Sequence, residues 1–327
     1  MSGKLRIGII GCGDFLRLRA ADLLSSRQVE VKLLYSPVNS ANAERYAEIF
    51  GAKAADSPEA IINDPEIDVV CVFVPPFVRK EYVLAVAKAG KQIVATKPLS
   101  ADLSDAREMT EAVEQAGVRC GVIYRRTNNP VIEAYKEIFS GGEFGKLALY
   151  KQDWLHHYPT WNRWATDPKK NGGPFMDAML HNLNAARYLM GRRVVGRAFF
   201  SDDHTHSLAC DDTQFLKVDF EQGASAHLFI TWAAELAVYD SAKNDREHID
   251  QCFMVTDQGW LFRNEIREGK VVITATRNGL EKDFPVIPFE ETFFDRYAKE
   301  IKNRDILPAD LPDIREAYED LRILLEN

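Results

Sequence analysis

The sequence has few of the features that mark secreted, zinc-stabilised or membrane proteins. Its five cysteines in 327 residues are scattered and form no CxxC pair. This pattern is typical of reduced thiols in a cytosolic chain and not of a disulfide or zinc framework. No uninterrupted apolar stretch approaches the ~20 residues of a membrane span. The N-terminus leads directly into a strand-like pattern with no signal peptide, so we expect a cytoplasmic protein without a membrane partner.

Positive charge does not predominate either. The chain has 41 Lys and Arg residues against 49 Asp and Glu residues, a formal net charge of −8. A nucleic-acid surface needs a basic field, so we expect no nucleic-acid partner. A hydrophobic content of 46% and a charged content of 28% are ordinary for a globular protein. Because 327 residues exceed what one core usually holds, we expect two domains.

A glycine turn near the N-terminus is the first candidate functional feature. Apolar residues of segment 5–10 end at Gly11-Cys12-Gly13, and a helix-like pattern follows, which predicts a buried strand that turns into a helix. Paired glycines at such a turn let the backbone approach the diphosphate of a ligand, which the helix N-terminus binds. Glycine also occurs in turns for steric reasons alone. Leu16 stands where a third glycine is usual, which implies a shifted helix.

The first part of the chain alternates between strands and helices. Continuous apolar runs predict further strands at residues 29–35, 69–74, 92–96 and 118–124. Helical patterns separate them at residues 41–50, 81–89 and 104–116. Such an alternation is typical of a doubly wound parallel sheet of the Rossmann type, covered by helices on both faces. We therefore predict an α/β domain at residues 1–123.

The pattern changes after residue 123. The next predicted elements are a helix at 131–139, a strand at 147–154 and a helix at 174–190. From Val194 on, strand-like segments follow one another with short glycine turns, which indicates an antiparallel sheet. Residues 213–220 alternate so that one face is exposed and the other packs on helices or on another subunit's sheet. We predict a C-terminal α+β domain at 124–327 on a large, mostly antiparallel open sheet. Its amphipathic helix at 314–325 is a candidate to pack back on the first domain.

Lys97 is the first candidate for catalysis. It ends the predicted strand 92–96, at the edge where open α/β sheets bind ligands. Pro98 biases Lys97 towards an extended backbone, which would aim its side chain out of the strand end. A lysine beside a bound substrate can orient a hydroxyl group and lower its pKa by its charge. The alternative is a solvated lysine at a strand end, which is the commoner case.

The predicted helix after Gly172-Gly173 carries the second candidate group. Spacing of i, i+4 and i+7 places Asp177, His181 and Asn184 on one face. The histidine can exchange a proton near neutral pH, and a carboxylate beside it would steady its charged form. Asp177 and Asn184 can bond sugar-like hydroxyls. A capped helix with a hydrogen-bonded core histidine explains the same spacing and stays open.

Aromatic residues with polar tips are dense in one predicted loop. They could form a platform for an apolar sugar face and supply donors to its hydroxyls. The group comprises Trp154, His156, His157, Tyr158, Trp161, Arg163 and Trp164. Aromatic core packing explains part of this density. Segment 202–206 offers metal-like ligands without a clear fourth partner, so we expect a solvated loop and no metal site.

Together these motifs resemble the glucose-fructose oxidoreductase and inositol dehydrogenase family of sugar and polyol dehydrogenases, over essentially the whole chain. The resemblance rests on IGIIGCG at residues 7–13, Val74-Pro75, Thr96-Lys97-Pro98, Tyr124-Arg125, and Gly172-Gly173 followed by Asp177 and His181. Lys97 matches the lysine of the family's Glu-Lys-Pro motif, and Asp177 with His181 match its Asp-x-x-x-His pair. This implies that these three residues form the catalytic group.

The resemblance also implies the other site residues. The residues that would hold an NAD(P) cofactor are Gly11, Gly13, Asp14, Phe15, Leu16, Ser36, Val74, Pro75, Thr96 and Lys97. The residues that would contact a sugar, amino-sugar or polyol are Tyr124, Arg125, Trp161, Arg163 and Asn184. Hydride would move between the nicotinamide and a carbinol or keto carbon. In the family the second sheet commonly makes the subunit interface, which implies a homodimer or homotetramer.

Several positions depart from the family pattern. Thr96 replaces the usual glutamate, Arg79 a frequent histidine and Asn184 a common aspartate, which leaves substrate and stereochemistry open. Ser36 stands where an acidic residue would hold the adenosine ribose, so a 2′-phosphate meets no repelling charge there. We therefore favour NADP, although Ser36-Pro37 is also explained as a turn.

Two other functions are compatible with the same residues. One is a redox-neutral lyase or glycosidase that uses a tightly held cofactor to oxidise the sugar transiently. The other is a non-catalytic NADP-binding regulator, against which the joint presence of Lys97, Asp177 and His181 speaks. The sequence also leaves open whether Lys97 or His181 carries the substrate's proton.

Overall fold

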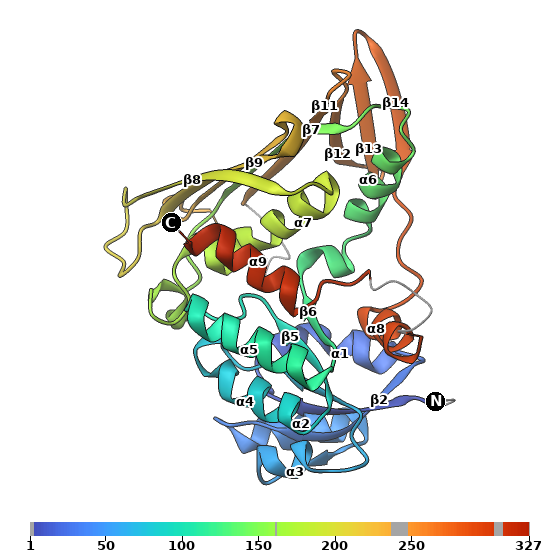
Figure 1. The fold of residues 1–327 in the computed structure, drawn as a ribbon, viewed down its shortest axis with the longest axis vertical. Helices are drawn as coiled ribbons and strands as arrows, with labels where there is room; N and C mark the ends of the chain where they lie inside the picture. The colour runs from blue at the N-terminus through green and yellow to red at the C-terminus, as the bar shows by residue number, and fades with distance from the viewer. Residues whose placement is uncertain (1–2, 161, 237–247, 304–309, 327) are drawn as a thin grey trace. The chain divides into compact units, whose positions relative to one another are not determined.

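The structure, a computed structural model, describes residues 3–160, 162–236, 248–303 and 310–326 (Figure 1). The chain divides into two compact units, the first comprising Met1–Asn128 and Phe289–Leu321 and the second Asn129–Pro288 and Arg322–Asn327. The predicted fold class is confirmed, because one unit holds a parallel sheet and the other a mostly antiparallel one. Among the described residues, no helix is both long and apolar enough to cross a membrane.

The first unit is built around a six-stranded parallel sheet with the order β3-β2-β1-β4-β5-β6. Its strands are β1 (Leu5–Ile10), β2 (Val29–Tyr35), β3 (Lys53–Ala54), β4 (Val69–Val72), β5 (Gln92–Thr96) and β6 (Cys120–Ile123). β4 and β6 are buried along their whole length, as expected for strands covered on both faces. The strand order reverses between β1 and β4, and ligands of such sheets bind at the carboxyl ends beside this point.

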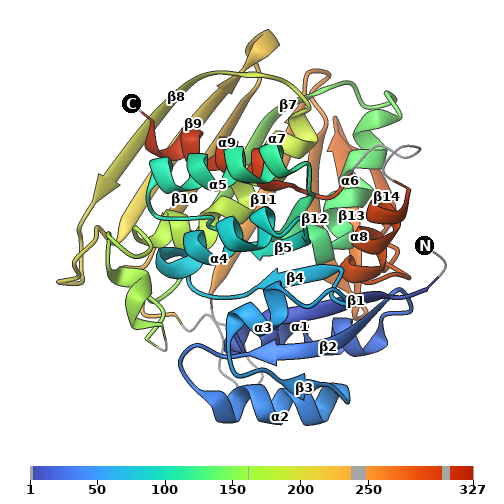
Figure 2. The same cartoon turned by 60° about the horizontal axis from the view of Figure 1, so that its bottom comes forward.

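Helices fill the connections between these strands (Figure 2). They are α1 (Asp14–Ser25), α2 (Ser40–Phe50), α3 (Pro58–Ile62), α4 (Pro76–Lys88) and α5 (Leu103–Ala116). Local chemistry sets the ends of α2: the Asn39 side chain accepts a hydrogen bond from the Ala41 N–H, and Gly51 has a φ of 64°. The short elements β3 and α3 are not among the elements predicted from the sequence.

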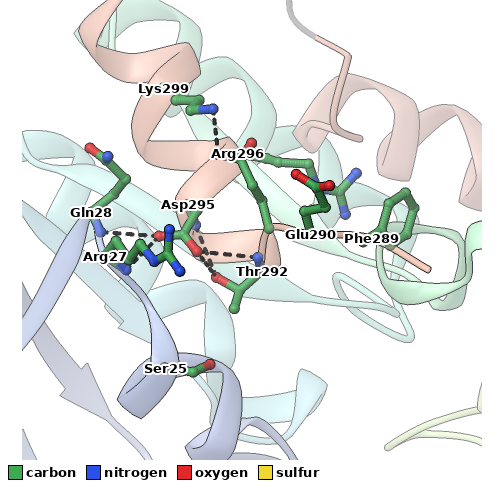
Figure 3. Close-up of a pocket in the computed structure, with 10 residues that line it drawn as sticks. Ser25, Arg27, Gln28, Phe289, Glu290, Thr292, Asp295, Arg296 and Lys299 are labelled. Carbon is green, nitrogen blue, oxygen red and sulfur yellow. Dashed lines mark hydrogen bonds and ion pairs between the residues drawn. The ribbon is translucent and has the colours of Figure 1, made fainter. Parts of the chain in front are cut away.

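A helix from the far end of the chain completes the first unit. α8 (Phe293–Lys302) contacts α1 and β2, and its Phe293 and Phe294 rings belong to the same core cluster as the apolar residues of β1. At its N-terminus, Asp295 and Thr292 form a capping box, and Asp295 also accepts a hydrogen bond of 2.6 Å from the Ser26 hydroxyl. Thr292 and Asp295, together with Arg27 and Gln28, line a pocket of about 1000 Å³ beside the start of β2 (Figure 3). It lies at the amino ends of the strands, away from the ligand-binding edge.

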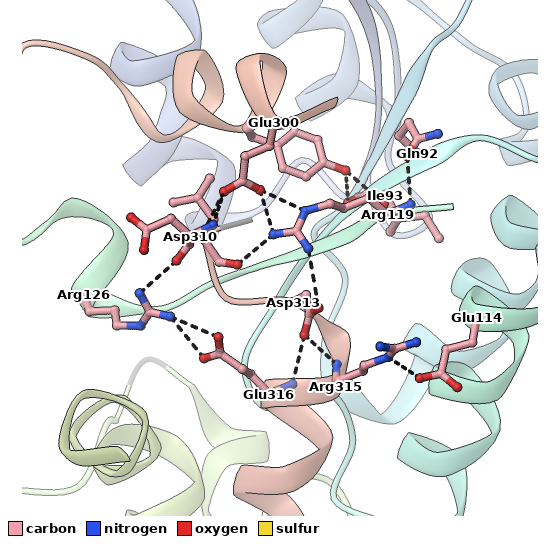
Figure 4. A network of polar contacts seen from close by, with 12 residues as sticks. Gln92, Ile93, Glu114, Arg119, Arg126, Glu300, Asp310, Asp313, Arg315 and Glu316 are labelled. Carbon is pink, nitrogen blue, oxygen red and sulfur yellow. Dashed lines mark hydrogen bonds and ion pairs between the residues drawn. The ribbon is translucent and has the colours of Figure 1, made fainter. Parts of the chain in front are cut away.

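A polar network joins α8 and the chain that follows it to the arginines on either side of β6 (Figure 4). Arg119 Nη2 lies 2.7 Å from Glu300 Oε2, and Arg119 Nη1 lies 3.4 Å from Asp313 Oδ2. Arg126 is buried, and its Nη2 atom lies 3.1 Å from Glu316 Oε2. Partly buried pairs of this kind fix geometry better than exposed ones because solvent screens them less. The network therefore anchors the returning chain beside the end of the parallel sheet.

The second unit contains an eight-stranded sheet with the order β14-β13-β12-β11-β7-β10-β9-β8. Its strands are β7 (Leu147–Leu155), β8 (Val194–Asp202), β9 (Thr213–Phe220), β10 (Ser225–Thr231), β11 (Ile249–Thr256), β12 (Leu261–Arg267), β13 (Lys270–Arg277) and β14 (Leu280–Pro285). Neighbouring strands are antiparallel except β7 and β10, which are parallel. The predicted succession of strands with glycine turns is thereby confirmed.

Helices pack against this sheet. They are α6 (Pro130–Ser140) and a longer helix that begins with the π-helical segment η3 (Phe175–Met179) and continues as α7 (Leu180–Met190). In β9, Leu216 and Val218 are fully buried, whereas Phe215 and Lys217, which alternate with them, are partly exposed. Phe200 of β8 is 59% exposed and stacks on Phe215 with ring centroids 6.1 Å apart. The predicted alternation of buried and partly exposed residues in β9 is therefore present. The last helix of the chain is α9 (Ile314–Leu325).

Candidate active site

The turn between β1 and α1 requires glycine at position 11. The φ of Gly11 is +106°, and a Cβ atom there would lie 2.7 Å from the Phe73 carbonyl carbon and 2.9 Å from the Val74 nitrogen. Both distances are too short, so another residue would push the turn away from the end of β4. The Gly11 N–H donates to the Tyr35 carbonyl over 2.8 Å. The turn is therefore held beside the reversal point of the sheet.

Helix α1 begins at Gly13 without a capping side chain. By contrast, a side chain accepts a hydrogen bond from the first turn of α2, α3, α5, α6 and α8. A Cβ atom at Gly13 would meet nothing within 4 Å, so the start of α1 has an open side. Backbone N–H groups at an uncapped helix start bind anions such as phosphate.

The other predicted residues of this turn have distinct places. Asp14 begins α1 and is exposed, whereas the Phe15 ring packs edge-on against Phe73 with centroids 5.0 Å apart. Leu16, which replaces the usual third glycine, is 0% exposed and belongs to the core of the unit. Its side chain therefore leaves the open side of the turn unobstructed.

A small pocket follows the ends of β2 and β3. It has a volume of about 170 Å³ and is lined by Tyr35, Ser36, Ser40, Ala43, Glu44, Ala54, Ala55 and Asp56. Ser36 Oγ accepts a hydrogen bond of 3.3 Å from the Asn39 N–H, within the turn that leads into α2. The pocket thus combines two serine hydroxyls with two carboxylates, which suits hydroxyl groups of a ligand.

Arg79 of α4 links the ends of β4 and β5. Its side chain is 1% exposed, and Nη2 donates to the Val74 carbonyl and to the Thr96 hydroxyl over 2.7 Å each. Nη1 donates to the carbonyls of Thr96, Pro98 and Leu99. All these acceptors are neutral, and burial lowers the pKa of Arg79 to about 9. Arg79 therefore fixes the backbone on both sides of Lys97.

Lys97 follows β5 at the same sheet edge as Gly11 and Val74. It is partly buried, and its peptide bond to Pro98 is cis. Pro75 directly precedes α4 and supplies no side-chain cap, and the hydroxyl of the buried Thr96 accepts a hydrogen bond from Arg79. The predicted cofactor residues at the ends of β1, β2, β4 and β5 thus share the carboxyl edge of one sheet, although their contact with a cofactor stays a prediction.

The predicted helix of the second catalytic group begins differently from expectation. The sequence predicted a regular helix from residue 174, but Phe175–Met179 is π-helical, and such segments are frequent at functional sites. Asp177 and His181 are partly buried, and the Asp177 N–H donates to the Gly173 carbonyl over 3.0 Å. Asn184 is fully buried. Asp177 and His181 belong to the second unit and Lys97 to the first, so their convergence stays a prediction.

The predicted substrate residues fall into two groups. Tyr124 is buried at the end of β6, and Arg125 follows it in a short 3-10 turn, partly exposed. Trp161 and the side chain of Arg163 lie outside the described residues. Their proposed contacts with a sugar are therefore untested.

His156, in the predicted aromatic loop, is a core residue. It is 2% exposed and lies near the rings of Trp154 and Trp232, at centroid distances of 5.3 Å and 6.5 Å. Its Nδ1 lies 2.7 Å from the His157 carbonyl oxygen. Burial lowers the pKa of His156 to about 4, so this imidazole is neutral near pH 7. Part of the aromatic density in this loop is therefore core packing.

This buried histidine predicts an acid-dependent loss of stability. An unfolded histidine binds its proton near pH 6.5 and the folded His156 only near pH 4, so protons favour the unfolded chain within this window. When the pH is lowered from 7 to 4.5, we expect the free energy of unfolding to fall by about 2 kcal/mol more in the unmodified protein than in His156→Asn. Urea unfolding at both pH values measures the difference. The exposed His204 serves as the control in His204→Asn, and equal losses in all three proteins would refute the assignment.

Sequence reasoning did not find the role of Arg79. In the sequence, Arg79 stands out only as a departure from a frequent histidine, because nothing in an amphipathic helix pattern shows which carbonyls a buried guanidinium will reach. A charged residue within the buried stripe of α4 was the available signal, since an arginine is rarely buried unless its donors are satisfied.

Comparisons with known protein families match both units. Residues 5–124 match a model described as "Oxidoreductase family, NAD-binding Rossmann fold". Residues 132–246 match the model of the GFO/IDH/MocA C-terminal domain. The two matches follow one another along the chain in the order that the two sheets do.

Individual relatives extend over nearly the whole chain. A scyllo-inositol 2-dehydrogenase (NAD(+)) of Bacillus subtilis is 25% identical over 93% of this chain and 86% of its own length. A myo-inositol 2-dehydrogenase of Thermotoga maritima is 27% identical over 91% of this chain and 86% of its own length. The crystal structure of an aldose-aldose oxidoreductase from Caulobacter crescentus, complexed with glycerol, has a TM-score of 0.82 at 18% identity, covering 98% of this chain and 95% of that one. This last similarity concerns the fold.

Proposed function

Because the chain belongs to the GFO/IDH/MocA family of oxidoreductases with an NAD-binding Rossmann fold, we propose that it moves a hydride between a nicotinamide cofactor and a carbinol or keto carbon of a sugar, amino-sugar or polyol. The observation that carries the proposal is the turn at Gly11, which has no room for a Cβ atom and leads into an uncapped helix. That combination suits a dinucleotide diphosphate.

The first unit supplies the cofactor residues in this proposal. Backbone groups of Gly11, Gly13, Asp14, Phe15 and Leu16 would bind the diphosphate, and Ser36 the adenosine ribose. The residues that would border the nicotinamide are Val74, Pro75, Thr96 and Lys97. When bound, the nicotinamide accepts or donates the hydride. The chain's own groups have to hold it, exclude water and manage the proton that accompanies the hydride.

The proton is assigned to residues from both units. Lys97 would polarise the substrate oxygen by its charge, and His181 would exchange the hydroxyl proton. Asp177 would orient the substrate and steady the charged form of His181. Direct proton transfer by Lys97 is the alternative within the same scheme. The residues proposed to bind the remaining hydroxyls are Tyr124, Arg125, Trp161, Arg163 and Asn184.

A substrate screen tests the reaction class. Sugars and polyols are offered with NAD and NADP separately, and their keto forms with the reduced cofactors, while absorbance follows the nicotinamide. We expect net cofactor turnover with at least one pair. A cofactor that co-purifies tightly and shows no net turnover while a sugar is cleaved would replace the proposal by a redox-neutral reaction. Binding of cofactor without any conversion across the panel would replace it by a regulatory role.

For the cofactor's 2′ position we propose a modest preference for NADP. Ser36 ends β2 without a negative charge, whereas Glu44 and Asp56 in the same pocket act against a phosphate and limit the preference. We expect Ser36→Asp to lower the ratio of kcat/KM for NADP to that for NAD about a hundredfold, because a carboxylate repels the phosphate and accepts from a ribose hydroxyl. The exposed Ser104 of α5 gives the control Ser104→Asp, which adds the same charge elsewhere. An unchanged ratio in Ser36→Asp would contradict the assignment.

The proposed assembly is a homodimer or homotetramer through the second sheet. Its support is the face of that sheet opposite the helices, where the 59% exposed Phe200 stacks on Phe215, since exposed apolar surface marks interfaces. Sedimentation velocity of the protein and of Phe200→Glu tests it. We also propose a cytoplasmic location, supported by the five cysteines, which all lie in the described parts of the chain and form no disulfide there.

A further inference from the structure

Three segments that are distant in sequence meet at one end of the second sheet. β7 and β10 are parallel, with Leu155 opposite Thr231, and Thr231 is also paired with Thr213 at the start of β9. The chain that leaves β7, the chain that leaves β10 and the loop that enters β9 therefore emerge side by side. His157 lies on the first of these segments, Glu235 on the second and His206 on the third.

The side chains of these residues form a compact group of ligand atoms. One atom from each of His157, His206 and Glu235 lies within 4.8 Å of the others. His157 Nε2 is 3.5 Å from Glu235 Oε2, and His206 Nε2 is 3.9 Å from Glu235 Oε1. Two ligands bound at about 2.1 Å to a tetrahedral zinc ion lie about 3.4 Å apart. The group is therefore close to the geometry that such an ion requires.

The backbone holds the three segments in place. The His157 N–H donates to the Leu236 carbonyl over 2.8 Å, and the Trp232 N–H donates to the Asp212 carbonyl over 2.7 Å. The fully buried Asp212 carboxylate accepts hydrogen bonds from the backbone N–H groups of residues 204–206, including that of His206 over 3.1 Å. The loop that carries His206 is thus anchored on a charge.

The hydrogen bond made by the His157 ring leaves the lone pair of its other nitrogen facing the Glu235 carboxylate. His157 Nδ1 lies 2.8 Å from the Tyr158 carbonyl oxygen, so Nδ1 carries the proton and Nε2, which faces Glu235, is unprotonated in the neutral ring. This is the arrangement found for metal-binding histidines. His206 Nε2 lies 3.0 Å from the Trp232 carbonyl oxygen, and a cation bound at that nitrogen would replace this hydrogen bond. We therefore expect weaker binding than at a closed four-ligand site.

We propose that His157, His206 and Glu235 form a binding site for one divalent transition-metal ion of the zinc class. Two imidazoles and a carboxylate are a donor set that zinc prefers, with water or a ligand oxygen in the fourth position. Glu235 is 73% exposed, so the site is open to solvent. The bound ion would join the three segments at this end of the sheet. The inference is independent of the proposed hydride transfer.

Direct titration of the metal tests the proposal. Tag-free full-length protein, treated with a chelator and desalted, is titrated with zinc chloride in a calorimeter, and its thermal unfolding is followed with and without the ion. We expect one ion per chain and a higher melting temperature with zinc. With cobalt chloride, we expect the visible absorption of a tetrahedral complex without the bands of thiolate ligation.

Matched variants identify the ligands. Glu235→Gln removes the charge from an exposed side chain, and we expect it and His206→Ala to weaken zinc binding at least about tenfold. His204→Ala, in the same loop but outside the cluster, and Cys210→Ser, at a partly exposed thiol, should bind zinc as the unmodified protein does. No stoichiometric binding by the unmodified protein, or equal weakening in His204→Ala, overturns the proposal. Unaltered affinity in Glu235→Gln overturns it as well, even if His206→Ala fails to fold.

Discussion

Lys97→Met should lower kcat about a thousandfold while the Kd of the nicotinamide cofactor changes less than about twofold. The expectation follows from the proposed role of the charge, which stabilises the substrate oxygen when a proton leaves it and contributes to the transition state more than to cofactor binding. Methionine keeps an unbranched side chain only one atom shorter, and the segment around it remains held by Arg79. Steady-state kinetics and fluorescence titration of the cofactor give the two quantities.

The control for this change is Lys88→Met, which removes an exposed lysine from the end of α4 in the same unit. It should leave both quantities unaltered. Parallel losses of kcat and cofactor affinity in Lys97→Met would show that the lysine binds the cofactor and does not act on the substrate. The dependence of kcat on pH identifies the proton carrier. If the fall of kcat at low pH disappears in His181→Asn and persists in Lys97→Met, His181 carries the proton.

Arg79→Met should lower the free energy of unfolding by at least about 3 kcal/mol. The substitution keeps an apolar stem in the buried stripe of α4 but removes the donors that reach Val74, Thr96 and Leu99. Each of these acceptors is then left in the interior without its partner, and an unsatisfied buried carbonyl costs more than a hydrogen bond contributes. Urea unfolding at pH 7 measures the loss.

Arg17→Met is the matched control, because Arg17 of α1 is 61% exposed and its pairing with Asp14 is a surface ion pair. It should change the stability by less than about 0.5 kcal/mol. A loss below about 1 kcal/mol in Arg79→Met would mean that water replaces the guanidinium without penalty and that the ends of β4 and β5 do not depend on it.

The parallel sheet was predictable because its signals are local. The strands at 29–35 and 92–96 have the predicted bounds, since continuous apolar runs closed by turn residues leave few alternatives. α8 escaped prediction although its apolar residues are regularly spaced, and its place against α1 depends on chain that returns from residue 289. The π-helical start of the helix after Gly173 was also missed, because α- and π-helical turns share the same sequence pattern over a few residues.

In the candidate site, too, some features follow from local sequence and others depend on distant parts of the chain. The glycine turn is a property of adjacent residues, and its structural requirement at Gly11 was foreseeable. The neighbourhood of His157, His206 and Glu235 depends on the order of β7, β10 and β9 in the sheet, which no local pattern specifies. The acceptors of Arg79 depend in turn on how two successive strands end. Local chemistry thus predicts where a ligand's diphosphate binds, and strand order decides which side chains surround the other positions.

Isotope transfer tests the proposed reaction most directly. A polyol identified in the screen is prepared with deuterium on the carbinol carbon and converted by the enzyme with oxidised cofactor in ordinary water. The reduced cofactor is then isolated and its mass determined. Direct hydride transfer predicts that the reduced nicotinamide carries the deuterium. Reduced cofactor without the label, or conversion of the polyol with the cofactor unchanged, would contradict hydride transfer between this carbon and the nicotinamide.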